Sequence, residues 1–394
     1  MRRVKIGGVT ALLRPFTGYL PASAFGSCVV GPPSLLLTEE QKEATRREPL
    51  SFRHAAGRKT HSSHEEASGW LAMVEQKGGL IRTDSAVVVY RQRTHDHAAV
   101  GVLANVRLDA YQKGLIKPHE RTIARTQKKM TDYMRTTRVY GNPAVLTHRS
   151  DDALAMLLAV HTQDIPNVSF TSIDGIQHEL WVVAGSDAEV LSSHYAGPLY
   201  ITDGHHRFAA AAEVALAEKR HDASLPVGLF ATDQLSLRSF ARCITDPDLD
   251  LAGLRHRLRA AFSLREAPSD QGRSKRRGEV AVGIGKRRYL LEFDRENLPG
   301  DAYEALDVKL LQSQVLRPVF GIADARKDGR VEFVPDVPGA GDPSFDADVW
   351  FLPYPPTIED VISVADNSLV MPAKSTLFFP KLPSGLMIRH LDLD

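Results

Sequence analysis

The stretch that most constrains the fold is residues 198–212, with the sequence PLYITDGHHRFAAAA. The apolar run at 199–201 predicts a buried strand, and Asp203-Gly204 predicts a tight turn. The alanine-rich segment from His205 to about Arg220 predicts a helix. A strand, a glycine turn and a helix in this order direct free backbone N–H groups and the positive end of the helix dipole at one point. The sequence therefore predicts an anion-binding turn.

Three cationic or titratable side chains, His205, His206 and Arg207, fall in the first turn of this helix. Acidic side chains would be the stabilising choice there, so helix energetics alone does not explain the three residues. A bound anion explains them, with Gly204 and the three side chains as its contacts and Asp203 among the catalytic residues. The alternative is that Asp203 caps the helix and the other side chains face solvent or pair with acids.

The order of the expected elements predicts a mixed α/β fold. Strand and helix patterns alternate across 86–244, and the β-forming stretches at 86–93 and 100–108 predict a hairpin. The pattern changes after Thr245, which predicts two parts, an α/β core over 11–245 and a C-terminal α/β part over 246–394.

Composition narrows the classes of function. The 49 basic and 48 acidic residues give no electrostatic case for nucleic acid or a membrane surface. No apolar run approaches the roughly 20 residues that a membrane span requires. Cys28 and Cys243 are the two cysteines, with no ligand partner at metal-site spacing, so we expect no metal site and a reducing, cytoplasmic setting.

A second informative stretch is Gly114–Thr122, with the sequence GLIKPHERT, which leads into a polar helix to about Thr137. Pro118 suits a helix start, so His119 and Glu120 are expected in the first turn. The functional interpretation makes His119 and Glu120 an acid/base pair. In the alternative, Glu120 only complements the helix dipole.

A third stretch, residues 370–386, contains Lys374, Ser375 and Thr376. An ammonium group and two hydroxyls suit phosphate oxygens or a metal-bound phosphate. The stretch lacks the Gly-x-x-x-x-Gly frame of a P-loop. A buried connector with a satisfied lysine is the alternative.

Together these three stretches resemble the prokaryotic domain of unknown function 1015 family. The family's Asp-Gly-His-His-Arg-[Tyr/Phe] turn is matched by 203–208, its His-Glu-x-Thr element by 119–122, and its Met-Pro-x-Lys-Ser-Thr-x-Phe-x-Pro-Lys motif by 371–381. The opening Leu-Arg-Pro-Phe at 13–16 and the closing Gly-Leu at 385–386 agree as well.

The resemblance implies a ParB/sulfiredoxin-like core with elaborations at both ends, in which such a turn lies against nucleotide phosphates. It also implies a small-molecule kinase that uses ATP and Mg²⁺ to make O-phospho-L-serine, because several relatives phosphorylate free L-serine. On this hypothesis residues 204–207 hold the donor phosphates, and Lys374, Ser375 and Thr376 flank the transferred group. Glu120, steered by His119, takes the hydroxyl proton.

Two departures from the family pattern support a rival hypothesis. Ser34-Leu35 stand where the family has Tyr-Asp, and Ala241 stands where it has His. The rival is a nucleotide- or phospho-ligand-binding regulator without catalysis. A third hypothesis, a ParB-like DNA-binding protein, is disfavoured by the balanced charge.

Overall fold

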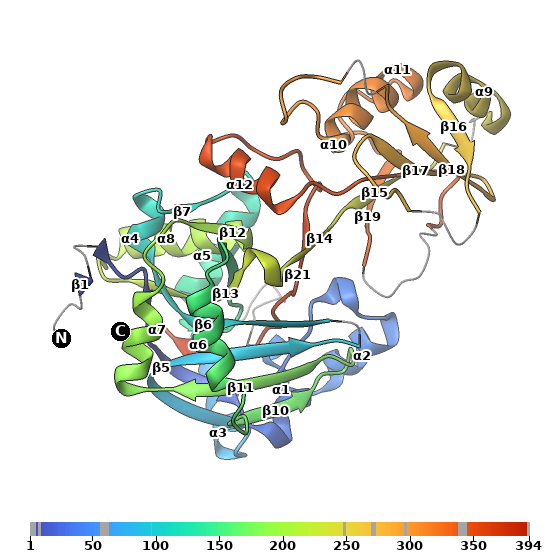
Figure 1. The fold of residues 1–394 in the computed structure, drawn as a ribbon. Coiled ribbons are helices and arrows are strands. Elements are labelled where there is room, and N and C mark those ends of the chain that lie inside the picture. Colours follow the sequence, from blue (N-terminus) through green and yellow to red (C-terminus); the bar gives the residue numbers. More distant parts are fainter. Residues whose placement is uncertain are drawn as a thin grey trace. The chain divides into compact units, whose positions relative to one another are not determined.

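The computed structural model describes residues 5–6, 9–55, 63–95, 97–246, 250–268, 273–294, 298–337 and 345–391. The chain forms two compact units, which Figure 1 shows in the colours of the sequence. Unit 1 comprises Met1–Ser236 and Pro380–Asp394, and unit 2 comprises Leu237–Phe379. Each unit is described by itself below.

The division between the units differs from the boundary expected after residue 245. Strand β15 (Phe240–Ile244) pairs with β19 (Val331–Pro335) and β20 (Val349–Pro353), so it is part of the sheet of unit 2. The last segment of the chain returns to unit 1, where β22 (Arg389–His390) pairs with β8 (Val139–Tyr140). Strand pairing between distant segments therefore determines where each unit begins and ends. The change of composition near Thr245 does not indicate this pairing.

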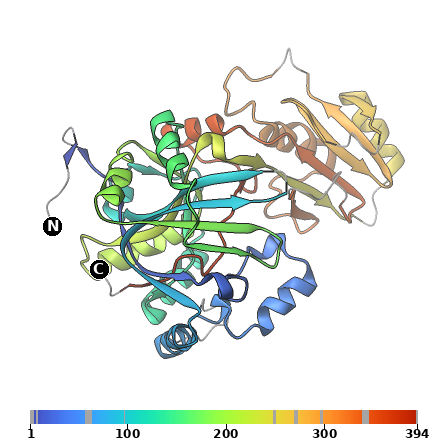
Figure 2. The same ribbon diagram turned by 60° about the horizontal axis from the view of Figure 1, so that its bottom comes forward.

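Unit 1 is built on a mixed sheet with the order β10-β11-β5-β6-β13-β9-β12-β7, with β3 against β6 and β4 against β5. The pairs β13–β9 and β12–β7 are parallel and the other pairs are antiparallel. This sheet confirms the predicted mixed α/β class, and the antiparallel β5–β6 pair confirms the predicted hairpin. The strands are β3 (Leu13–Arg14), β4 (Phe16–Pro21), β5 (Leu80–Arg93), β6 (Ala98–Arg107), β7 (Ile116–Lys117), β9 (Ala144–His148), β10 (Val168–Thr171), β11 (Gln177–Val183), β12 (Leu199–Asp203) and β13 (Ser224–Ala231). Figure 2 shows β5, β6 and β11 running side by side.

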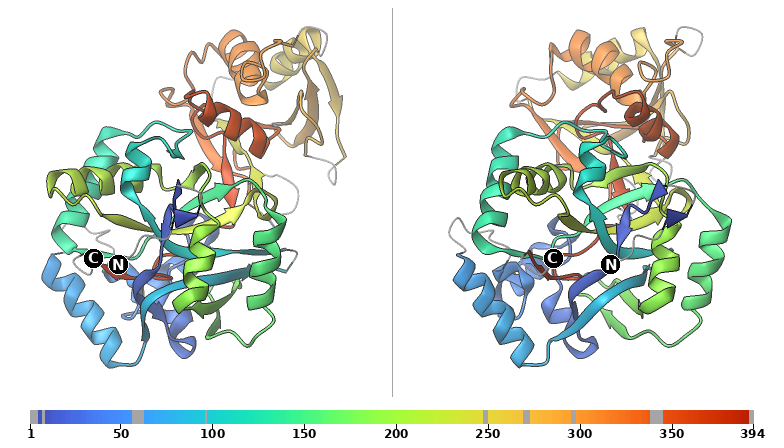
Figure 3. Two further views of the ribbon diagram at one scale, coloured as in Figure 1. Left: turned by 60° about the vertical axis from the view of Figure 1, so that its left-hand side comes forward. Right: turned by 90° about the vertical axis from the view of Figure 1, so that its left-hand side faces the viewer.

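Most helices of unit 1 bury apolar side chains, whereas α2 (Glu39–Arg47) buries only Thr45. Helix α8 packs beside α5, as both views of Figure 3 show. Small alanine side chains on α8, among them Ala210 and Ala211, are buried in the core with Phe208 and Ile201, which allows α8 to pack closely against α4, α5 and β9. The helices are α1 (Gly26–Val29), α2 (Glu39–Arg47), α3 (His64–Gln76), α4 (Leu108–Gln112), α5 (Ala124–Thr137), α6 (Asp152–His161), α7 (Gly185–Ser193) and α8 (His205–Ala217). A short two-stranded ladder, β1 (Lys5–Ile6) and β2 (Val9–Thr10), precedes them.

Unit 2 contains an antiparallel sheet with the order β16-β18-β17-β20-β15-β19. Its remaining strands are β16 (Ser263–Glu266), β17 (Glu279–Ile284) and β18 (Arg287–Glu292), and the short β14 (Ser236–Arg238) pairs with β21 (Leu377–Phe379). Its helices are α9 (Leu251–Ala261), α10 (Asp307–Leu310), a π-helical turn at Leu311–Leu316, α11 (Arg317–Phe320) and α12 (Ile358–Asp366). Its core forms where α9 and the 307–320 segment meet apolar residues of β17, β18 and β20. In the described parts of both units, no helix has the length and apolar character needed to cross a membrane.

Candidate functional site

The turn between β12 and α8 has the backbone geometry that the sequence predicts. Strand β12 ends at Asp203, and Gly204 adopts φ 100°, a left-handed conformation that side chains disfavour. A Cβ atom at Gly204 would lie 2.8 Å from the Cβ of Ala144 and 2.9 Å from Nε of Arg207. In the described structure no side chain caps α8, and its first turn contains no acidic residue. The first N–H groups of α8 are therefore available to an anion.

Arg207 braces this turn through its guanidinium group. One terminal nitrogen donates to the carbonyl oxygens of Asn142 (3.0 Å) and Pro143 (2.6 Å), and the other donates to Oδ2 of Asp203 (2.8 Å). The side chain of Arg207 is 16 % exposed. The sequence predicts Arg207 as a phosphate contact. In the structure its guanidinium instead ties the start of α8 to the segment before β9, and contact with a phosphate stays a prediction.

Lys381 is a second cation beside the turn, and sequence reasoning missed it. Its ammonium nitrogen lies 4.0 Å from Oδ2 of Asp203, and its side chain is 10 % exposed. Burial alone would raise the pKa of Asp203, but the charges of Lys381 and Arg207 outweigh it and lower this pKa to about 2. In the sequence, Lys381 is the last residue of the 371–381 motif. It is far from Asp203 along the chain, so no local pattern indicates their contact.

Two histidines of the first turn accept hydrogen bonds from the backbone. Nε2 of His205 accepts from the N–H of His119 at 3.3 Å, and Nε2 of His206 accepts from the N–H of Ile123 at 2.9 Å. A neutral imidazole that accepts through Nε2 holds its proton on Nδ1. Burial lowers the pKa of His205 well below its usual value, and burial and then Arg207 lower the pKa of His206. Both rings are therefore neutral at pH 7.

Glu120 faces the same turn from the segment between β7 and α5. Its Oε2 lies 3.9 Å from Nδ1 of His205, the atom that holds the proton, and its side chain is 36 % exposed. The ring of His119 packs edge-to-face on the ring of His205, with centroids 4.6 Å apart. Burial lowers the pKa of His119 to about 4, so this ring is also neutral at pH 7. His205 thus faces Glu120, whereas the sequence predicts His119 in this position.

The prediction that His119 and Glu120 lie in the first turn of a helix is wrong. Helix α5 begins at Ala124, and the two residues lie in a bend before it. The physical reason is tertiary. The backbone N–H groups of His119 and Ile123 are bound by the histidines of α8, which holds the segment in a non-helical path. Pro118 suggests a helix start from local sequence alone, and these hydrogen bonds to a distant segment cannot be predicted from it.

The third predicted group, Lys374, Ser375 and Thr376, belongs to unit 2. The ammonium nitrogen of Lys374 lies 5.1 Å from the centre of the Phe240 ring, and its backbone carbonyl accepts a hydrogen bond from Arg242. Ser375 is fully buried, and its hydroxyl donates to the carbonyl of Pro372 at 2.6 Å. That hydroxyl has a structural partner within unit 2. The role of the three residues in phosphate binding stays a prediction.

The site is rich in hydrogen-bond donors and contains few potential metal ligands. Among the residues that the structure describes, no three His, Cys, Asp or Glu side chains gather in a way that could hold a metal ion. Asp203 and Glu120 are the carboxylates at the turn, and Asp203 is already paired with two cations. Mg²⁺ in proteins is often held by one or two carboxylates together with substrate phosphates. A Mg²⁺ ion at this turn would therefore need most of its ligands from a bound phosphate compound and water.

Comparisons with known proteins agree with the motif pattern. Residues 13–309 match the sequence profile of the family described as "Protein of unknown function (DUF1015)". No curated protein matches the sequence. Solved structures that are similar include SbnI with a C-terminal truncation from Staphylococcus aureus, at 12 % identity and a TM-score of 0.41, covering 76 % of this chain and 91 % of that one. A free serine kinase in complex with AMP is similar at 15 % identity and a TM-score of 0.33, covering 73 % of this chain and 90 % of that one.

Proposed function

This chain belongs to the DUF1015 family of proteins of unknown function, and from its site we propose that it is a small-molecule kinase. The proposed reaction transfers the γ-phosphoryl group of MgATP to the hydroxyl of a free amino acid such as L-serine. Phosphoryl transfer depends mainly on positioning and on charge stabilisation, which a preformed anion site provides.

The observation that carries the proposal is the convergence of three chain segments of unit 1 on one helix start. The uncapped first turn of α8 presents backbone donors, Lys381 contributes a largely buried positive charge, and Glu120 contributes a partly exposed carboxylate. Helix N-termini bind phosphate through N–H groups and the helix dipole, and an ammonium group adds charge-assisted hydrogen bonds. In the proposed site, the groups that bind the phosphate anion therefore lie close to the carboxylate of Glu120.

In the proposed reaction Glu120 acts as the general base. Its carboxylate accepts the proton of the substrate hydroxyl while the hydroxyl oxygen forms a bond to the γ-phosphorus and the bond to ADP breaks. Nδ1 of His205 lies 3.9 Å from Oε2 of Glu120, and because this ring is neutral it places a polar N–H, not a full positive charge, beside the carboxylate. Lys381 and the amides of α8 offset the negative charge of the phosphates.

A binding module without catalysis is the second candidate, and a specific observation favours it. Ser34, which stands where the family pattern has Tyr, begins a short 3₁₀ turn at Ser34–Leu36, and Leu35 there brings no carboxylate. A kinase site with one carboxylate fewer could retain the nucleotide and lose turnover. The two candidates share the anion site at α8 and differ in the reactivity of Glu120.

Binding and turnover measurements on the full chain test the proposal. Calorimetric titration with MgATP and with AMP, the nucleotide held by one of the similar structures, should show binding. Incubation with MgATP and L-serine should then release ADP and phosphoserine. Substitution Glu120→Gln should keep the nucleotide affinity and lower turnover about 10²–10⁴-fold, because the carboxylate that accepts the proton is lost.

The control is Glu189→Gln, a matched change at an exposed position on α7, which should alter neither quantity. If the protein binds nucleotide but releases no ADP with any amino acid tested as acceptor, the result would favour the binding module. Absence of nucleotide binding to the unmodified protein would contradict both candidates.

A further inference from the structure

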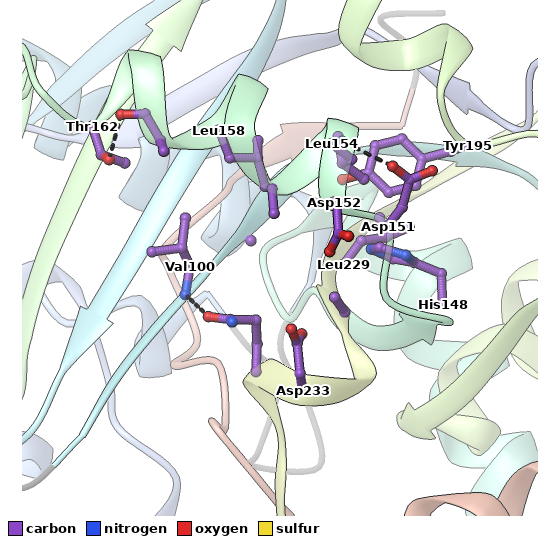
Figure 4. A pocket seen from close by; sticks show the side chains of 15 residues that line it. Val100, His148, Asp151, Asp152, Leu154, Leu158, Thr162, Tyr195, Leu229 and Asp233 are labelled. Carbon is purple, nitrogen blue, oxygen red and sulfur yellow. Dashed lines mark hydrogen bonds between the residues drawn. The ribbon is translucent and has the colours of Figure 1, made fainter.

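Unit 1 contains a pocket that the proposed kinase site does not use. It has a volume of about 210 Å³ and lies between α6, the start of β6, the end of β13 and the 3₁₀ turn at Thr232–Gln234, as Figure 4 shows. His148, the last residue of β9, lines it. Asp203 instead pairs with Val145 near the other end of the same strand. The pocket and the turn before α8 are therefore at opposite ends of β9.

The wall of the pocket is acidic. Asp151, Asp152 and Asp233 contribute carboxylates, and the lining residues that the structure describes include no lysine or arginine. Asp151 also caps α6, where its carboxylate accepts a hydrogen bond from the N–H of Leu154 at 2.9 Å. That bond lowers the pKa of Asp151, so its charge is maintained at neutral pH. The floor is apolar and is formed by side chains that include Leu154, Leu158 and Leu229.

A buried hydroxyl in the same lining is unsatisfied. Tyr195 is 2 % exposed, and its phenol oxygen has no hydrogen-bond partner in the described structure. Its ring lies beside Asp151 and Leu154 in Figure 4. Burial raises the pKa of Tyr195, so the phenol stays neutral. A buried hydroxyl without a partner is unfavourable, and a polar atom of a ligand in the pocket would supply one.

His148 adds an acceptor and no positive charge. Its Nδ1 donates to the carbonyl of Arg149 at 2.8 Å, so Nε2 holds the lone pair. Burial lowers the pKa of His148, which keeps the ring neutral. The ring packs edge-to-face on Tyr195, with centroids 5.1 Å apart. The polar groups of this pocket therefore consist mainly of acceptors and negative charges, which suit a cationic donor.

We propose that this pocket binds a small organic ammonium ion, at a site separate from the turn before α8. The ammonium group faces the three carboxylates and donates a hydrogen bond to the phenol oxygen of Tyr195. The apolar body of the ligand covers the leucine floor. A protein cavity of about 150 Å³ holds benzene, so a pocket of about 210 Å³ fits a single ring or a short alkyl chain with one amino group.

Three single-ring probes of similar size test the charge requirement in calorimetric titrations of the full chain. Benzylamine should bind, benzyl alcohol should bind at least tenfold more weakly, and benzoate should not bind. Asp152→Asn and Asp233→Asn should each raise the dissociation constant of benzylamine about two- to fivefold, as expected for ion pairs with exposed carboxylates. Asp187→Asn, at an exposed position on α7 outside the pocket, is the matched control and should leave it unchanged.

Tyr195→Phe tests the hydroxyl. It removes an unsatisfied buried group, so the midpoint of thermal unfolding should stay the same or rise, while the affinity for benzylamine falls about tenfold or more. Benzyl alcohol binding as well as benzylamine, or an unchanged benzylamine affinity in Tyr195→Phe, would overturn the proposal. Saturating AMP should leave benzylamine binding unaffected. Displacement by AMP would contradict the separation of the two sites.

Discussion

Replacing Lys381 by methionine tests whether the cation beside Asp203 serves ligand binding or only the fold. Methionine keeps most of the unbranched apolar stem and removes the charge. A charge-assisted hydrogen bond to a ligand contributes about 1.5–3 kcal/mol, so its loss should weaken MgATP binding about 10- to 150-fold. The expected loss is large because the ammonium group is largely buried and, in the proposed function, belongs to the anion site at α8.

The effect of the same substitution on stability should be small. The ammonium nitrogen of Lys381 is 4.0 Å from the Asp203 carboxylate, whose side chain is 40 % exposed. The carboxylate end of this pair is in contact with solvent, so removing the ammonium group leaves no fully buried unpaired charge. Arg207 still donates to Asp203 at 2.8 Å after the change, so the carboxylate keeps a partner. We therefore expect the free energy of unfolding to change by at most about 1 kcal/mol.

Calorimetric titration and urea unfolding of the same preparations separate the two effects. The matched control is Lys128→Met on α5, where the side chain is 77 % exposed and pairs with Asp132 on the helix surface. It should leave both quantities nearly unchanged. A Lys381→Met protein that binds MgATP with the affinity of the unmodified chain would refute the assignment of Lys381 to the anion site. A large fall in stability with unchanged affinity would make Lys381 a structural residue.

Three further predictions concern the stability of unit 1. Gly204→Ala should lower the free energy of unfolding by about 1–3 kcal/mol, because residue 204 has a left-handed backbone and its new Cβ would contact Ala144. The control Gly69→Ala, at an open position in α3, should raise the free energy of unfolding by about 0.5–1 kcal/mol. Urea unfolding measures both changes. Arg207→Ala should cost about 3 kcal/mol in the same assay, because three acceptors lose their donor, and an unchanged midpoint would contradict the bracing role. Burial lowers the pKa of His178 to about 3, so between about pH 3 and 6.5 the unfolded chain binds a proton that the folded chain does not, and stability falls with falling pH. His178→Gln should reduce the slope of unfolding free energy against pH there by up to about 1.4 kcal/mol per pH unit, and an unchanged slope would show that His178 does not titrate this way.

Local signals in the sequence were sufficient for the strand, turn and helix at 198–212. Each part rests on neighbouring residues: an apolar run, a glycine that adopts φ 100°, and a helix-forming alanine stretch. The β5–β6 hairpin is predictable for the same reason, because its strands follow one another directly.

The partners within the site could not be predicted, because they depend on contacts between distant segments. His205 and Glu120 are 85 positions apart, and Lys381 reaches Asp203 only after the chain has passed through unit 2. The predicted start of α5 is wrong for the same reason, because His206 of α8 accepts a hydrogen bond from the N–H of Ile123. No pattern within the 114–137 stretch encodes that bond.

The geometry also changes which atoms of the turn can bind an anion. The sequence predicts that three side chains of this turn contact the anion, but each of them has a partner within unit 1. His205 and His206 accept hydrogen bonds from the backbone N–H groups of His119 and Ile123. Arg207 donates to two backbone carbonyls and to Asp203. The groups that we propose for binding an anion are therefore the backbone N–H groups of the uncapped first turn, together with Lys381 beside Asp203. Backbone donors persist through side-chain substitution as long as the turn keeps its shape. Changes at His205, His206 or Arg207 should therefore weaken the fold of the turn first and binding only as a consequence, so their effects on affinity must be compared at matched stability. In the proposed reaction, substitution of Lys381 should affect binding and substitution of Glu120 should affect turnover.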